Sequence, residues 1–66
     1  MNQPIEGARV TGRYGHFLRV EAPSAPEHLR VLYLTPLQAP RSEVGTVGRL
    51  VWCQSASCGF WLFERK

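Results

Sequence analysis

The residues best suited to chemistry in this 66-residue chain are two cysteines and two histidines. A tetrahedral zinc site needs four ligands, and the chain has four candidates in Cys53, Cys58, His16 and His28. Their spacing differs from that of the usual zinc-binding motifs, so we expect free thiols and no metal. A disulfide is geometrically conceivable under oxidising conditions, because the cysteines lie at opposite ends of a short polar segment.

Groups suited to catalysis are sparse. The chain has no aspartate, and its five glutamates are scattered, so a paired-carboxylate mechanism has no support. The stretch 45–49 lacks the Lys-Ser/Thr ending of a phosphate-binding loop. A Cys–His nucleophile needs a desolvated cleft, which so small a domain seldom supplies. We therefore expect no enzyme and no cofactor, unless a site forms between subunits.

Aromatic and arginine side chains form the one constellation that suggests a function. The net charge is +3, and seven of the eight basic residues are arginine, whose planar fork suits phosphate groups. Small β-barrels hold single-stranded nucleic acid by stacking bases on aromatic rings and neutralising phosphates. We therefore expect a nucleic-acid-binding module, possessing a site made of Arg13, Tyr14, Arg19, Arg30, Arg49 and Trp61.

The strand expected over 58–64 is apolar on both faces. Phe60 and Leu62 alternate with Trp61 and Phe63, so one face must be covered by more chain, by another subunit or by a ligand. A chain this short is marginally stable alone, which favours oligomerisation. The alternative function is therefore a homo-oligomeric or protein-interaction module with Trp61 and Phe63 in the interface.

A third reading comes from a resemblance. Arg9 and Arg13 have the Arg-x-x-x-Arg spacing of PilZ domains, and the stretch 48–52 resembles their closing hairpin. The Asp/Asn-x-Ser-x-x-Gly motif that lies between these features in PilZ domains is absent. The resemblance implies a nucleotide-binding module.

These side chains must be positioned by a small β-rich domain. After a flexible lead over 1–6, residues 7–66 are expected to form one domain. Alternating and β-branched stretches predict two hairpins. The first comprises strands 8–11 and 16–21 with a turn at 12–15, and the second comprises strands 46–53 and 58–64 with a loop at 54–57. Gly48 and Gly59 lie inside strand patterns and predict bulges or sharp bends.

Residues 25–34 allow two interpretations. Ser24 and Glu27 match a capping box, which would begin a short helix. The apolar run 29–34 followed by Pro36 suits a buried strand, and the surrounding strand–turn–strand pattern favours that reading. The fold expected is an all-β, antiparallel SH3-like or OB-like barrel of four to five strands. The alternative is a curled sheet with one short helix over 25–34.

The location follows from what the chain lacks. No apolar run approaches the ~18–20 residues of a membrane helix. The first residues have neither the basic start nor the apolar stretch of a signal peptide. We expect a cytoplasmic protein that does not interact with a membrane.

Overall fold

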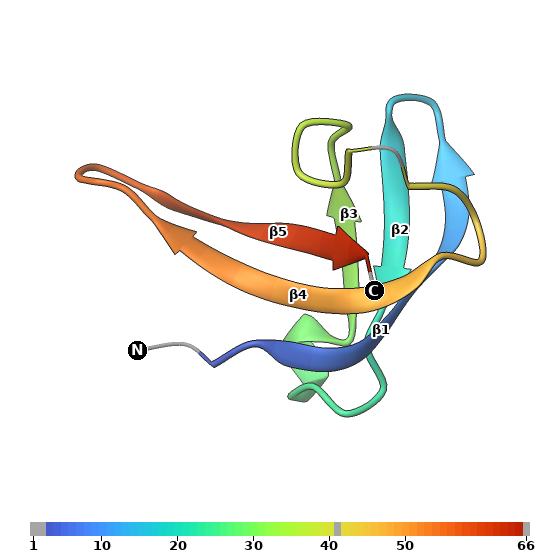
Figure 1. The fold of residues 1–66 in the computed structure, drawn as a ribbon, viewed down its shortest axis with the longest axis horizontal. Helices are drawn as coiled ribbons and strands as arrows, with labels where there is room; N and C mark the ends of the chain where they lie inside the picture. The colour runs from blue at the N-terminus through green and yellow to red at the C-terminus, as the bar shows by residue number, and fades with distance from the viewer. Residues whose placement is uncertain (1–2, 41, 66) are drawn as a thin grey trace.

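The computed structural model describes residues 3–40 and 42–65, which form one sheet of five antiparallel strands (Figure 1). In chain order the strands are β1 (Ile5–Tyr14), β2 (Phe17–Glu21), β3 (Val31–Leu34), β4 (Val47–Gln54) and β5 (Gly59–Arg65). Their order across the sheet is β3-β2-β1-β4-β5. The expectation of an all-β, antiparallel fold is confirmed. Ile5 and Glu6, the end of the expected flexible lead, belong to β1, and Met1 and Asn2 lie outside the described residues.

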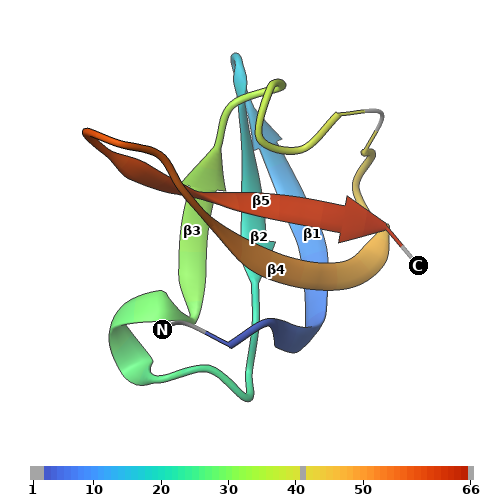
Figure 2. The same cartoon turned by 60° about the vertical axis from the view of Figure 1, so that its left-hand side comes forward.

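The sheet curls over itself without closing. The β4–β5 hairpin crosses over the layer made by the other three strands, as the two views agree (Figures 1 and 2). β5 then meets the segment that follows β3, where the Phe63 amide donates to the Gln38 carbonyl at 2.7 Å. The Gln38 side-chain amide also donates to the Trp61 carbonyl at 3.0 Å. Within the described residues no strand ladder joins β3 to β5, so the sheet is open.

The core fills the space between these two layers. Its largest fully buried side chains are Val10 of β1, Val20 of β2 and Leu50 of β4. Alternation along each strand supplies them, because successive side chains point to opposite faces of a sheet. The remaining buried apolar residues are Ala8, Leu18, Ala22, Ala25, Leu34, Ala39 and Phe63.

Two register shifts in β1 bend this strand so that it can serve both halves of the sheet. Gly7 is the extra residue where β1 pairs with β4, and its φ of 75° is one that glycine adopts without strain. Thr11 is the extra residue where β1 pairs with β2, between the pairs Val10–Val20 and Gly12–Arg19. The sequence pattern predicted no bulge at either position. Each shift reverses the faces to which the following side chains point.

The first hairpin is longer than predicted. The sequence predicted a turn over 12–15. In the structure the strands continue to Tyr14 and Phe17, which lie opposite each other, and the turn consists of Gly15 and His16. Gly15 has a φ of 61°, which a tight hairpin turn of the primed types requires. Gly12, expected in the turn, lies in the strand ladder.

Residues 25–34 resolve mainly as a strand. β3 spans Val31–Leu34, which confirms the strand interpretation for this part of the run. The helical alternative is reduced to the three-residue 3-10 helix η1 (Glu27–Leu29). A longer helix is prevented because the Arg30 carbonyl accepts a hydrogen bond from the Ala22 amide, which commits the chain to the sheet.

The second hairpin pairs without a register shift from Gly48–Arg65 to Gln54–Gly59. Of the two alternatives predicted for Gly48 and Gly59, bulges or sharp bends, a bulge is therefore absent from this hairpin. At both positions other atoms lie too close to the backbone for a side chain to fit. A Cβ at position 48 would overlap the Glu64 carbonyl oxygen, and one at position 59 would overlap the Trp52 ring.

Candidate functional site

Exposed aromatic rings gather on the outer face of β1, β2 and β3, on the side away from the core. The ring centroids of Tyr14 and Tyr33 lie 6.1 Å apart in an edge-to-face arrangement. Their exposed fractions are 55% and 57%, and Phe17 is 47% exposed. We call this surface, together with Arg9 and Arg19, the tyrosine face.

The sheet register explains how rings from β1 and β3 meet across β2. Arg19, in the middle strand, pairs with Gly12 on one side and with Tyr33 on the other. Gly12 has no side chain, and a Cβ there would lie 2.8 Å from Cε2 of Tyr14. The Tyr14 ring therefore lies over Gly12 and reaches across the middle strand to Tyr33.

Arg19 lies between Gly12 and Tyr33 in the same row of side chains. Its Nε is shielded from solvent and has no hydrogen-bond partner among the described residues. One terminal nitrogen of Arg19 lies 3.5 Å from the Glu21 carboxylate. Arg9 of β1 lies opposite Glu21 in the strand register. With two arginines against one glutamate, the tyrosine face carries a positive balance.

Of the six predicted binding residues, the structure brings together Tyr14 and Arg19. Arg13 is adjacent to Tyr14 in the chain, yet it pairs with the buried Leu18 and lies on the inner side of the hairpin tip. Arg30 lies before β3, at the end of the strand remote from Leu34, and its Nε donates to the Ala25 carbonyl at 3.1 Å.

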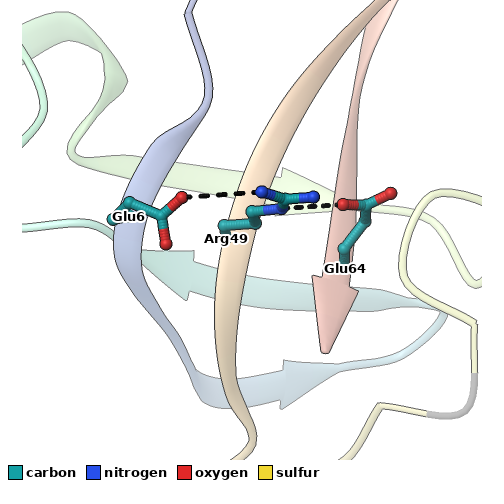
Figure 3. Close-up of polar contacts among 3 residues, drawn as sticks. All are labelled: Glu6, Arg49 and Glu64. Carbon is teal, nitrogen blue, oxygen red and sulfur yellow. Dashed lines mark hydrogen bonds and ion pairs between the residues drawn. The ribbon is translucent and has the colours of Figure 1, made fainter. Parts of the chain in front are cut away.

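Arg49 is held by two carboxylates instead of facing the tyrosines. Its Nε donates to Glu64 at 2.8 Å, and a terminal nitrogen lies 3.8 Å from Glu6 (Figure 3). The hydrogen bond and charge of Glu64 raise the pKa of Arg49 above its already high ordinary value, and Glu6 adds a smaller effect. The three residues tie β1, β4 and β5 together, and their charges leave no net positive charge for a phosphate.

The aromatic face predicted for the last strand is mostly internal. Phe63 lies opposite Leu50 in the core and is 2% exposed. Trp61 is half-buried, packs against the core and meets Trp52 edge to face at 5.2 Å. The reason is the crossing of the β4–β5 hairpin over the other layer, which turns the Trp61 and Phe63 side inward. Phe60, on the opposite side, is 42% exposed.

The PilZ-like pair of arginines is not brought together. Four residues of regular strand would place Arg9 and Arg13 on one face, but the extra residue at Thr11 lies between them. Arg9 consequently points outward beside Glu21, and Arg13 points inward beside Leu18. The Arg-x-x-x-Arg spacing therefore does not place the two arginines on one face of this strand.

Cys53 and Cys58 are both free thiols, the first half-buried and the second exposed. The residue opposite Cys53 is Phe60, because strand pairing ends at Gln54 and Gly59. Cys58 lies in the loop, where its sulfur is 3.4 Å from the Ser55 hydroxyl. Across residues 3–40 and 42–65, no three His, Cys, Asp or Glu side chains gather closely enough to hold a metal ion.

Two residues of the tyrosine face were not among the predicted site residues, namely Phe17 and Tyr33. Phe17 begins a strand whose alternate residues Leu18 and Val20 are buried, so its outward orientation is readable from the pattern. Tyr33 similarly precedes the buried Leu34. The alternation of each strand could have found both residues, but not their proximity to Tyr14.

Comparison of the chain with models of known protein families, with characterised proteins and with solved structures found no significant match. In the part of the chain that the structure describes, no helix has the length and apolar character needed to cross a membrane. The function must therefore be argued from the site itself.

Proposed function

We propose that this protein binds single-stranded nucleic acid on the tyrosine face. The observation that carries the proposal is the exposed Tyr14–Tyr33 ring pair, with Arg19 in the strand between the two tyrosines. Exposed rings are platforms on which bases stack, and arginines beside them neutralise the phosphates that connect the bases. Arg9 and Arg19 supply that charge here, and the chain as a whole carries +3.

The strand arrangement is consistent with this role. The sequence led us to expect an SH3-like or an OB-like barrel. Of these two, we propose that the fold is a partly open barrel of the OB type. A long, bent first strand is shared by two hairpins, and β5 returns to the segment after β3. OB-type barrels bind oligonucleotides on the face of their second and third strands, next to the loop between the first two. Phe17, Arg19 and Tyr33 occupy that face, and Tyr14 borders that loop.

The test is fluorescence anisotropy with a labelled oligothymidylate of about ten nucleotides, a length suited to one such fold. If Arg9 and Arg19 each neutralise one phosphate, log affinity should fall with log salt with a slope of about −1.4. Binding that does not weaken as salt rises would exclude phosphate neutralisation.

A matched pair of variants locates the site. Tyr33→Ala should weaken binding by about 1–3 kcal/mol, the value of one base–aromatic stack. Phe60→Ala removes a comparably exposed ring from the β4–β5 hairpin and should leave the affinity unchanged. Equal losses in the two variants would contradict a site on the tyrosine face.

A second candidate function is a homo-oligomeric or protein-interaction module. Since Phe63 is in the core, the surface available for it is the other side of the hairpin, where Phe60 is exposed beside the half-buried Val51 and Leu62. Light scattering on the wild type and Phe60→Glu separates the two candidates. A dimer that the substitution dissolves, together with no affinity for oligonucleotides, would favour this second function.

A further inference from the structure

A pocket lies on the inner side of the first hairpin's tip, behind the tyrosine face. Its cavity volume is about 380 Å³, within the range of small-molecule sites. Arg13, His16 and Leu18 line it from the hairpin, and Ala39, Ser42 and Glu43 line it from the connection between β3 and β4. The turn of the hairpin and residues 35–40 lie at the same end of the sheet (Figures 1 and 2).

Hydrogen bonds of the backbone fix the walls of the pocket. The Val10 amide donates to the Thr46 carbonyl at 2.9 Å, and the Gly45 amide donates to the Val10 carbonyl at 2.7 Å. These bonds place the turn that contains Glu43 alongside β1. The Glu43 amide in turn donates to the Thr46 hydroxyl at 3.0 Å, and the Thr46 amide donates to the Glu43 carbonyl at 3.0 Å, so these bonds of the turn use the Glu43 backbone.

The pocket is lined by charges of both signs. Among residues 3–40 and 42–65, neither Arg13 nor Glu43 has an ion-pair partner. The side chain of Ser42 is buried in the same wall, and with the described residues it makes a single long hydrogen bond, 3.4 Å to the Pro40 carbonyl. A ligand that suits this pocket must have acceptors for a guanidinium and donors for a carboxylate.

We infer that the pocket takes a guanine base from a single strand bound on the tyrosine face, an inference that rests on the proposed function. Guanine has acceptors at O6 and N7, to which an arginine donates two bonds. It also has donors at N1 and N2, which a carboxylate accepts on the Watson–Crick edge. Adenine lacks O6 and the N2 amino group, so it satisfies neither Arg13 nor Glu43 fully.

The path from the tyrosine face to the pocket is short. Arg13 and Tyr14 are consecutive residues that point to opposite sides of the same strand. The hairpin ends two residues later, at Gly15 and His16, so one nucleotide rounds the tip to bring the next base into the pocket. His16, at the tip, is one of the residues that line the pocket.

The experiment measures the affinity of labelled oligothymidylates that carry guanine, inosine, adenine or thymine at one central position. The guanine strand should bind about tenfold more tightly than the adenine and thymine strands, the discrimination of one good bidentate contact. Inosine lacks only the N2 amino group and should lie between them. Amide resonances of Arg13, Ser42 and Glu43 should shift with the guanine strand alone.

Glu43→Gln tests the pocket directly, and Glu27→Gln is its matched control. Glu27 is an exposed carboxylate in η1, remote from the pocket, so its replacement changes the net charge equally. The guanine preference should vanish in Glu43→Gln and persist in Glu27→Gln. Equal affinity of the wild type for all four strands, or a preference that survives Glu43→Gln, would overturn the pocket assignment alone. Absence of binding to every strand would overturn the proposed function and this inference with it.

Discussion

The rings of Tyr14 and Tyr33 meet at 6.1 Å with their planes inclined by 67°, although their strands are separated by β2. This contact depends on two local features of β1. The extra residue at Thr11 turns Tyr14 outward, and the missing side chain at Gly12 leaves room for its ring. The relationship creates an exposed pair of rings on either side of the strand that carries Arg19.

Gly12→Ala should displace the Tyr14 ring. The added Cβ would lie 2.8 Å from Cε2 of Tyr14, and an exposed ring can move at little cost. We therefore expect weaker oligonucleotide binding with a nearly unchanged thermal unfolding midpoint. The measurement combines anisotropy with the nuclear Overhauser contacts between Tyr14 and Tyr33. If those contacts and the affinity both persist, the role given to Gly12 is wrong.

Arg19→Gln and Arg49→Gln remove the same charge from different environments. Arg19→Gln should weaken oligonucleotide binding and make the log–log salt slope shallower by about 0.7, which corresponds to one phosphate contact on a single strand. Arg49→Gln should leave binding and slope nearly unchanged, because Arg49 is engaged by Glu6 and Glu64.

The effect of Arg49→Gln on stability should be a small decrease in the unfolding midpoint, since exposed ion pairs contribute little. Because the pKa of Arg49 is raised, the stabilisation that depends on its own charge is fully present around neutral pH, where Glu6 and Glu64 are ionised. That contribution is lost only as pH rises through the raised pKa. No step in the stability of the protein should therefore arise from Arg49 near neutral pH. A salt slope that falls equally in both arginine variants would indicate a diffuse electrostatic effect and contradict the site.

Gln38→Ala should reduce the free energy of unfolding by about 0.5–1.5 kcal/mol, the net value of a hydrogen bond made by a part-buried side chain. The Gln38 side chain joins Trp61 of β5 to Thr35, accepting from the amide of Thr35 at 3.1 Å. Gln54→Ala is the control, because Gln54 is exposed and its side-chain hydrogen bonds, to Trp52 and to the following loop, all lie within the second hairpin. Urea denaturation of both variants is the measurement. Equal effects would mean that Gln38 does not hold the ends of the sheet together.

The sequence by itself determined the features that depend on local alternation. The second hairpin, the strand ending at Leu34 and the antiparallel all-β class follow from β-branched and aromatic residues separated by turn residues. Such patterns are readable because each strand buries every second side chain, independently of which strand lies beside it.

Only the tertiary structure decided where the site residues lie. A bulge depends on the partner strand, so the register shift at Thr11, and with it the separation of Arg9 from Arg13, has no local signature. Phe63 is buried because the β4–β5 hairpin crosses the other layer, a relation between segments distant in sequence. Alternation tells which side chains share a face of one strand, whereas the packing of the two layers determines which face becomes core and which stays exposed.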